Sequence, residues 1–273
     1  MDWLEVHRGT APLIVSLPHT GSDIPVELAD GFVSPWLATR DADWWVDKLY
    51  GFATDLGATT IRTRLSRSVI DVNRDPSGAS LYPGQFTTGL CPTQTFDGEP
   101  LYKVSGPDPR EIERRRKSYF EPYHVALRDE IARLRRQHDR IVVYDAHAIR
   151  SVVPSLFEGQ LPHLNIGTNG DASCDPALTR AVEAACNDGP FSRVTNGRFR
   201  GGWITRHFGR PEIGIHAIQM ELACRGYMDD PAQAPEPSTW PSPYDLQRAE
   251  PLRATLQAIL IACLTFTETP SPS

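Results

Sequence analysis

Short apolar segments alternate along this sequence with longer segments whose apolar residues recur at helical spacing. The apolar segments have the length of buried strands and cover residues 12–17, 59–64, 68–72, 141–144 and 215–222. Helical spacing occurs in residues 41–56, 109–137, 176–186 and 252–266, and Pro122 predicts a kink in the second of these helices. Strands that alternate with helices pack as layers, so the pattern predicts an α/β layered fold.

The remaining segments show neither the apolar runs of a strand nor the helical spacing. Residues 75–108 are rich in Gly, Pro, Thr and Asp, and a loop of that length in a compact domain usually has a function. Residues 196–209 are rich in glycine, and residues 231–243 contain five prolines, which predicts a loop. Because no repeat or linker divides the chain, we expect one domain over residues 1–273, with a frayed tail from about residue 267.

Composition and charge argue against several classes of protein. With 40% hydrophobic and 23% charged residues and a net charge of -6, the chain has a globular composition and lacks the basic footprint of a nucleic-acid binder. Residues 1–10 lack a signal-peptide core, and the longest apolar run, residues 258–264, is too short to span a bilayer. The five scattered cysteines form no C-x-x-C pair. We therefore expect a cytoplasmic protein without nucleic-acid or membrane partners.

Polar residues follow the apolar segments at places where ligands bind in open α/β sheets. His19 follows the first segment, and Asp145 and His147 end the segment that starts at Ile141. Gln219 and Glu221 alternate on the last strand. Around the segment at 68–72 lie Arg67, Asp71, Asn73 and Arg74. The common nucleophile, nucleotide-binding and H-E-x-x-H motifs are absent, so these polar residues are the candidates for a site.

Each candidate also has a structural interpretation. His19 and His147 are either metal ligands or hydrogen-bonded structural residues. Asp145 either orients the imidazole two residues later or caps the following turn. Glu221 lies between apolar neighbours, where burial raises the pKa of a carboxyl group and suits it to proton transfer, but a buried ion pair with an arginine is the alternative.

Taken together, these segments resemble the N-formylglutamate amidohydrolase family. The matching stretches are collinear and cover about residues 12–230. They are Pro18-His19-Thr20-Gly21, Asp43-Trp44, Ser66-Arg67-Ser68-Val69-Ile70-Asp71-Val72-Asn73-Arg74, Ser80-Leu81-Tyr82-Pro83-Gly84-Gln85, Thr88-Gly89-Leu90-Cys91-Pro92, Tyr144-Asp145-Ala146-His147, Asn196-Gly197-Arg198-Phe199, Gly201-Gly202-Trp203-Ile204-Thr205-Arg206-His207 and Gln219-Met220-Glu221-Leu222.

That family is similar in turn to the zinc carboxypeptidases and aspartoacylases. The resemblance implies a three-layer α/β/α fold with a mixed, mostly parallel central sheet. It also implies roles in a fixed order along the chain: His19 and His147 as metal ligands, Arg67 for the oxyanion, Asn73 and Arg74 for a substrate carboxylate, and Glu221 as the base. It further implies one zinc ion per chain, with another divalent ion as the alternative.

Two positions depart from the relatives. They place a glutamate ligand three residues after the first histidine, where this chain has Ser22, so Asp43 is the first replacement, with Asp23 and Asp41 as alternatives. Ala148 stands where the family is expected to have serine. A dicarboxylic substrate needs a second cation, for which Arg150, Arg198 and Arg206 are open candidates, and Gln219 is a further candidate for substrate contact.

The implied reaction is hydrolysis of N-formyl-L-glutamate to L-glutamate and formate, a step of histidine degradation. Two alternatives stay open at this point. One is a deacylase of another acidic N-acyl amino acid, such as an N-acylaspartate. The other is a catalytically silent amino-acid-binding protein of the same fold. In each case the expected partner is a small acidic N-acyl amino acid, and the protein is expected to be a monomer or a small homo-oligomer.

Overall fold

The fold is built on a seven-stranded sheet with the order β1-β3-β2-β4-β7-β5-β6. It is seen in a computed structural model that describes residues 2–81, 84 and 87–269. The strands are β1 (Leu4–His7), β2 (Leu13–Leu17), β3 (Thr59–Thr63), β4 (Ile141–Ile149), β5 (Leu164–Gly167), β6 (Arg193–Thr195) and β7 (Ile215–Ala223). The motif residues Tyr82, Pro83 and Gln85 and the tail from residue 270 lie outside the described part of the chain.

The four central strands β3, β2, β4 and β7 run parallel. Strand β1 pairs with β3 antiparallel, and β5 and β6 run together against the direction of β7. Every residue of β2 and β4 is buried, as expected of strands that are covered on both faces. The expected mixed, mostly parallel sheet is confirmed.

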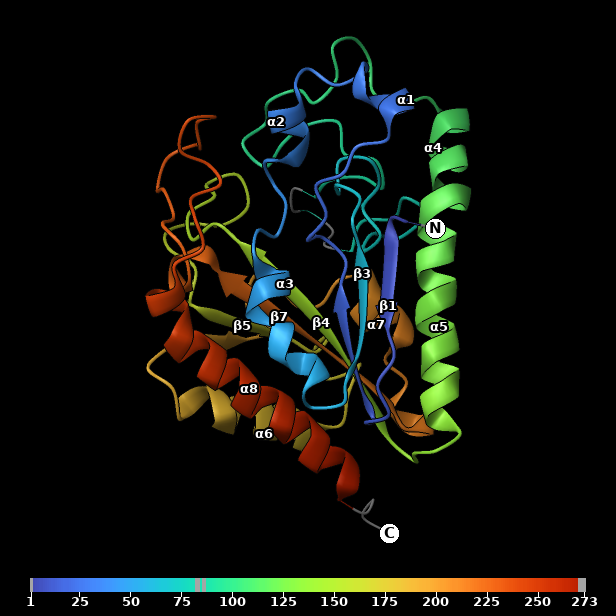
Figure 1. Ribbon diagram of the computed structural model, residues 1–273, viewed down its shortest axis with the longest axis vertical. Helices are drawn as coiled ribbons and strands as arrows, with labels where there is room; N and C mark the ends of the chain where they lie inside the picture. The colour runs from blue at the N-terminus through green and yellow to red at the C-terminus, as the bar shows by residue number, and fades with distance from the viewer. Residues whose placement is uncertain (1, 82–83, 85–86, 270–273) are drawn as a thin grey trace.

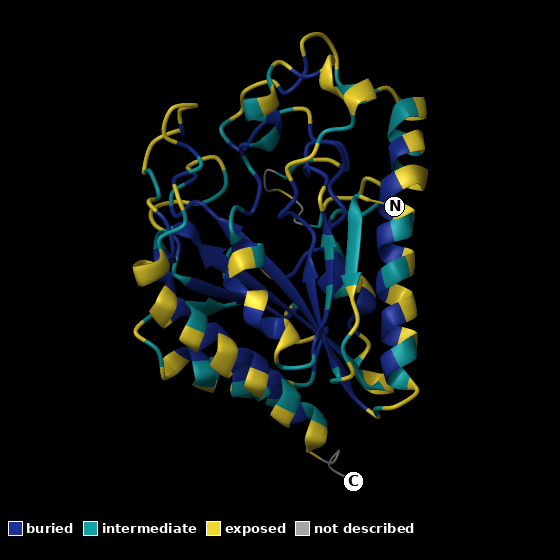
Figure 2. Ribbon diagram, in the orientation of Figure 1, coloured by how far each residue is buried: buried dark blue, intermediate teal, exposed yellow. Residues whose placement is uncertain are grey.

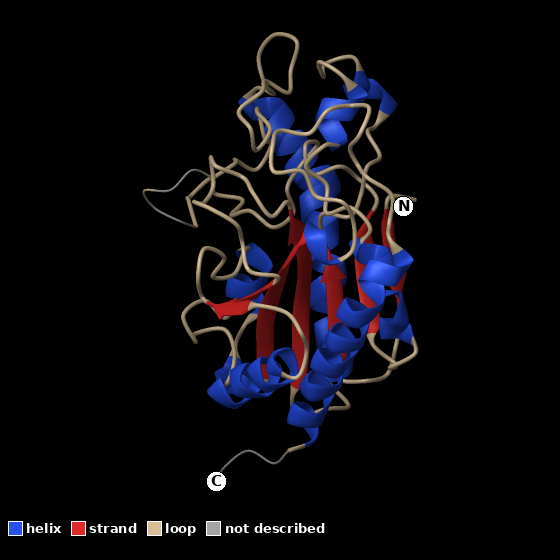
Figure 3. Cartoon of the chain, turned by 90° about the vertical axis from the view of Figure 1, so that its left-hand side faces the viewer, coloured by secondary structure: helices blue, strands red, loops and turns tan. Residues whose placement is uncertain are grey.

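Helices cover both faces of this sheet (Figures 1 and 3). One face packs on α3 (Val46–Leu49), α6 (Pro176–Asn187) and α8 (Leu246–Glu268). The other packs on α5 (Glu121–Arg135) and α7 (Trp203–Phe208). Side chains along β2 alternate between the two cores, with Leu13 and Val15 on the first face and Ile14 on the second. These two cores make the fold a three-layer α/β/α structure.

The remaining helical elements are short or lie in series with α5. They are α1 (Val26–Ala29), α2 (Pro35–Thr39), η1 (Gly51–Thr54), α4 (Pro109–Arg115), the π-helical η2 (Arg116–Phe120), η3 (Pro211–Ile213) and η4 (Cys224–Gly226). Helix α8 is long and apolar enough to cross a membrane by length and composition alone. Its buried apolar residues, among them Leu252, Ile259 and Phe266, belong to the first core and pack against the sheet.

The helix expected over residues 41–56 is interrupted. Trp45 has φ 64°, a left-handed conformation that a helix does not accommodate, and only Val46–Leu49 and the 3-10 turn Gly51–Thr54 are helical. The indole N–H of Trp45 donates to the Ser242 carbonyl at 3.0 Å, which fixes this unusual residue in place. The chain therefore turns just before α3, and this turn places Asp43 beside the end of β2.

The strand expected over residues 68–72 is wrong. Side chains bond the backbone here and hold it in turns, since Ser66 Oγ accepts from the Ser68 N–H at 3.1 Å and Asp71 Oδ1 accepts from the Asn73 N–H at 2.9 Å. Such local bonds offer the backbone an alternative to a sheet ladder. The apolar residues Val69, Ile70 and Val72 are buried all the same, which explains why the segment has the composition of a strand.

Other boundaries differ by smaller amounts. The predicted break near Pro122 appears as the π-helical η2 just before it, because a proline inside a helix removes a donor and clashes with the carbonyl four residues earlier. Strand β4 continues to Ile149, so Asp145 and His147 lie within it rather than after it. Helix α8 extends through residues 267 and 268, which were expected to be frayed. Strands β1, β5 and β6 and helix α7 were not predicted.

Loops gather beyond the carboxyl ends of the central strands, in the upper part of Figures 1 and 2. Residues 75–108 belong to this group and, where described, form no helix or paired strand of the sheet, as expected. Figure 2 shows the buried strands leading up into these loops. The side chains at the junction form the site described next.

Candidate metal centre and active site

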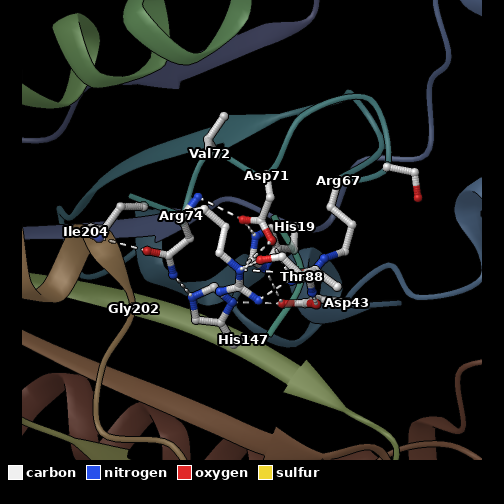
Figure 4. A network of polar contacts seen from close by, with 12 residues as sticks. His19, Asp43, Arg67, Asp71, Val72, Arg74, Thr88, His147, Gly202 and Ile204 are labelled. Atoms are coloured by element: carbon white, nitrogen blue, oxygen red, sulfur yellow. Dashed lines mark hydrogen bonds and ion pairs between the residues drawn. The ribbon is translucent and has the colours of Figure 1, made fainter. Parts of the chain in front are cut away.

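Two histidines and one aspartate converge at the carboxyl ends of β2 and β4 (Figure 4). His19, Asp43 and His147 are buried, and each offers one ligand atom within 4.8 Å of the others. Asp43 Oδ2 lies 3.0 Å from His147 Nδ1 and 3.7 Å from His19 Nδ1. Both imidazole rings therefore turn the same kind of nitrogen towards one carboxylate oxygen.

The fold brings these three residues together through the backbone. Strands β2 and β4 are parallel neighbours, so their carboxyl ends meet at one edge of the sheet. The Asp43 N–H donates to the His19 carbonyl at 2.9 Å, which attaches the loop before α3 to the end of β2. The Ala148 N–H donates to Asp43 Oδ2 at 3.2 Å. Residue 148 thus supports the aspartate through its backbone, and the alanine that departs from the family pattern keeps that contact.

A carboxylate stands behind each histidine. His19 Nε2 lies 2.6 Å from Asp71 Oδ1, and His147 Nε2 lies 3.1 Å from Asp145 Oδ2. Asp145 and His147 are two residues apart on β4 and point to the same side, so of the two interpretations Asp145 as the partner of the imidazole is confirmed. At His19, a carboxylate that accepts from Nε2 leaves the lone pair of Nδ1 for a metal ion. His147 Nε2 lies 2.8 Å from Asn73 Nδ2 as well, so its partners are an amide and a carboxylate.

The inner face of this group fits a metal ion. His19 Nδ1 is buried and has no hydrogen-bond partner among the described residues. Burial by itself would raise the pKa of Asp43, but hydrogen bonds from His147 and His19 outweigh it and lower that pKa below its usual value. Two imidazole nitrogens and an ionised carboxylate are a common ligand set for catalytic zinc, with a position left open. The site can therefore hold a divalent ion.

The two alternative carboxylates lie elsewhere. Asp23 is half-exposed and pairs with Arg64 at 3.0 Å. Asp41 is largely but not fully buried, and its Oδ2 accepts the Phe96 N–H at 2.7 Å. Of the three aspartates considered from the sequence, Asp43 is the one that the structure places between the two imidazoles.

A cleft opens from this group into the loops. Both histidines line it together with Asn73, Gln219 and Glu221. Its cationic side chains are Arg67, Arg74 and Arg198, and its apolar wall is formed by Phe96, Ile149, Leu156 and Phe199. A cleft with acid–base groups at one end and several guanidinium groups suits a small anionic ligand.

Glu221 lies on β7 in register with His147 on β4 and lines the cleft. Burial raises the pKa of its carboxyl group to about 7, and the neighbouring His147 acts in the opposite direction. Among the residues that the structure describes, no arginine forms an ion pair with Glu221, so the interpretation as a buried ion pair finds no support. A carboxyl group with a pKa near neutrality can both accept and return a proton.

The arginines differ in their placement. Arg67 donates to Asp71 Oδ2 at 2.8 Å and lies 3.5 Å from Asp43 Oδ1, with its guanidinium 5.0 Å above the Phe96 ring. Arg74 Nη2 donates to Thr88 Oγ1 at 3.1 Å. Both line the cleft beside the histidines.

Of the three candidates for a second carboxylate, Arg198 lines the cleft, where its Nε donates to the Leu156 carbonyl at 2.6 Å. Arg150 is buried and pairs with Asp97 at 2.6 Å. Arg206 donates to the Gly201 carbonyl at 2.9 Å. Neither Arg150 nor Arg206 is part of the described wall of the cleft.

Two amide side chains line the cleft but are bonded within the protein. Asn73 donates to Asp145 Oδ2 at 2.9 Å and accepts the Ile204 N–H at 2.7 Å. Gln219 donates to Glu221 Oε2 at 3.1 Å and accepts the Gly202 N–H at 2.7 Å. Their contact with substrate stays a prediction.

Sequence reasoning missed the role of Asp71 behind His19, although its place four residues after Arg67 in the same motif was a usable signal.

Comparisons with known proteins give a consistent result. Residues 11–228 match the family described as N-formylglutamate amidohydrolase. Over 265 residues, which are 96% of each chain, the sequence is 43% identical to the N-formylglutamate deformylase of Pseudomonas aeruginosa and 42% identical to that of Pseudomonas putida.

Solved structures agree on the fold. The crystal structure of an N-formylglutamate amidohydrolase from Ralstonia eutropha JMP134 is similar, with a TM-score of 0.79 at 21% identity, covering 98% of this chain and 99% of that one. A gene product of Agrobacterium tumefaciens is similar with a TM-score of 0.70 at 17% identity, covering 98% of this chain and 96% of that one.

Proposed function

The chain belongs to the N-formylglutamate amidohydrolase family, and on this premise we propose that it hydrolyses N-formyl-L-glutamate to L-glutamate and formate. The observation that carries the proposal is the buried His19–Asp43–His147 group, whose two histidines line one cleft with Glu221 and three arginines. This set combines a place for a metal ion, a proton acceptor and several cations for an acidic substrate.

The proposed metal is one zinc ion per chain, held by Nδ1 of His19, Nδ1 of His147 and a carboxylate oxygen of Asp43. Zinc bound in this way would lower the pKa of a water molecule and polarise the formyl C=O group. The unpartnered His19 Nδ1 and the carboxylates behind both imidazoles support this assignment.

The proton transfers fall to Glu221. Its carboxylate accepts a proton from the water that attacks the formyl carbon. It then delivers this proton to the amine nitrogen as the C–N bond breaks, which gives formic acid and the free amine of glutamate. The formic acid proton passes to the amine or to solvent, and formate and glutamate leave. Arg67, held near Asp43 and Asp71, donates to the negative charge that develops on the formyl oxygen. The buried, near-neutral carboxyl group of Glu221 supports its role as the base.

The carboxylates of the substrate are assigned to Arg74 and Arg198. Both guanidinium groups line the cleft, and each is anchored by an N–H donated to a neighbouring oxygen, of Thr88 and Leu156 respectively. Anchored guanidinium groups bind carboxylates with little loss of side-chain freedom. Two such groups match the two carboxylates of N-formylglutamate.

A substrate screen tests this proposal. Purified protein supplied with zinc is assayed for release of amine from N-formyl and N-acetyl derivatives of Glu, Asp and Gln. We expect the highest kcat/KM with N-formylglutamate. A preference for an N-acylaspartate would place the enzyme with the alternative deacylases, and binding without turnover would identify a silent binding protein. Discrimination of one methyl group is worth only about 1–3 kcal/mol, so the acyl group is compared on the same amino acid.

The ligand assignment has a matched pair of variants. Asp43→Asn removes the central carboxylate, whereas Asp23→Asn removes the half-exposed carboxylate that pairs with Arg64. Both substitutions keep the shape of the side chain. In a competition with a chelator, Asp43→Asn should lose zinc and Asp23→Asn should bind it as the wild type does. The reverse order would move the ligand to Asp23.

A further inference from the structure

Gln219 and Glu221 lie two residues apart on β7, so their side chains emerge on the same face of the sheet. Both are buried and both line the cleft. Gln219 Nε2 donates to Glu221 Oε2 at 3.1 Å. The amide of Gln219 therefore contacts the carboxylate of the proposed base directly.

The backbone of Gly202 fixes which end of the amide faces Glu221. Gln219 Oε1 accepts the Gly202 N–H at 2.7 Å. A backbone N–H can only donate, so the oxygen of the amide must face Gly202 and its NH₂ group must face the carboxylate. A reversed amide would place donor against donor and acceptor against acceptor. The N–H of Gln219 is thus held towards Glu221 before any substrate binds.

The same segment orients a second amide in the same way. Asn73 Oδ1 accepts the Ile204 N–H at 2.7 Å, and its Nδ2 donates to Asp145 Oδ2 at 2.9 Å. Figure 4 shows Gly202 and Ile204 beside this network. A Cβ atom at Gly202 would lie 2.5 to 2.6 Å from the amide atoms of Asn73, so the backbone and the amide approach more closely than a side chain at residue 202 would allow.

We propose that Gln219 is a positioning residue for Glu221: the N–H of Gly202 orients its amide, and the amide holds the carboxylate in the orientation that proton transfer requires. This inference rests on the proposed function, because it takes Glu221 as the base. It differs from the expectation that Gln219 binds substrate.

The test compares Gln219→Met with a control amide, Asn165→Leu. Asn165 is buried on β5 and donates to the backbone carbonyl of Glu221 at 3.0 Å, so it supports the same residue without touching the carboxylate. In the zinc-loaded enzyme, Gln219→Met should lower kcat about tenfold or more and shift the acid limb of the kcat profile upwards by about one pH unit. KM and zinc content should stay unchanged, and Asn165→Leu should lower stability without moving the pH profile.

A second variant, Gln219→Glu, keeps the inference testable if Gln219→Met does not fold. Gln219→Glu keeps an acceptor for the Gly202 N–H but places a carboxylate against Glu221, so the acid limb should shift upwards further, as like charges share a proton. ¹³C NMR of the Glu221 carboxyl group follows the same titration without an assay of activity. Unchanged kcat in both Gln219 variants, or an equal fall of kcat in Asn165→Leu, would overturn the inference. Full activity of Glu221→Gln would instead overturn the assignment of Glu221 as the base. An inactive wild type would overturn the proposed substrate. In both cases the NMR titration still decides the role of Gln219.

Discussion

The substitution Asp71→Asn gives the most direct test of the metal centre. Asp71 is fully buried, and its carboxylate lies 2.6 Å from His19 Nε2, 2.8 Å from Arg67 Nη2 and 3.6 Å from Arg74 Nε. Burial by itself would raise its pKa, but Arg74, His19 and Arg67 lower it well below the usual value. Asn keeps the shape of the side chain and removes the negative charge that these three groups share.

Two effects follow, and their sizes can be stated. Loss of the carboxylate behind a ligating histidine lowers metal affinity about 10–100-fold, or about 1.4–2.8 kcal/mol. Removal of one partner of a buried ion pair costs about 3–5 kcal/mol of stability, and we expect the lower end because Arg67 keeps Asp43 at 3.5 Å. Asp23→Asn is the control, since its partly exposed pair with Arg64 is worth less than about 1 kcal/mol.

Zinc affinity is measured by competition with a chromophoric chelator, and the free energy of unfolding is measured in urea on metal-free protein. Asp71→Asn should bind zinc more weakly and unfold at lower urea, whereas Asp23→Asn should match the wild type in affinity. A zinc dissociation constant of Asp71→Asn within twofold of that of Asp23→Asn would refute the reasoning, because it would mean that the charge on Asp71 does not act on His19.

Three further predictions concern the residues of the cleft. His19→Ala and His147→Ala should each leave the protein without bound zinc, as measured by elemental analysis; full occupancy in both would remove them from the ligand set. Glu221→Gln should keep zinc and KM while kcat falls about 10²–10⁴-fold. The activity of the wild type should rise with pH through about 7, because Glu221 loses its proton there. A flat profile from pH 6 to 8 would contradict its role as base. Arg198→Ala should raise KM for N-formylglutamate at least tenfold, whereas Arg206→Ala, outside the cleft, should not; equal values would assign the carboxylate elsewhere.

The central strands and most of the cleft were predictable because two physical patterns coincide. Buried parallel strands are runs of apolar residues, and a polar residue inside or directly after such a run is costly unless it has a partner. His19, His147 and Glu221 stand out for this reason. Asp43 does not, since it precedes a helix that is broken at Trp45, and only resemblance to a family selected it from three aspartates.

The errors have two causes: local side-chain bonds to the backbone in one segment, and contacts between distant segments in another. The turns at 68–72 depend on Ser66 and Asp71. The segment has the composition of a strand because Val69 and Ile70 belong to the second core, although they do not pair in the sheet. Helix α7 was hidden in a glycine-rich stretch, where Gly202 is required by the close approach of Asn73. Nothing local in the sequence contains that information.

The ligands of the metal centre are far apart in the chain, since Asp43 and His147 are separated by 104 residues. An unfolded chain holds no such group, so zinc would bind the native state and add a stability that grows with its free concentration, about 4.1 kcal/mol at a thousand times the dissociation constant. The hydrogen bonds behind both imidazoles do not require the ion, so a folded apoprotein is expected. Zinc supply would then set two properties of one molecule, its turnover and its lifetime on heating.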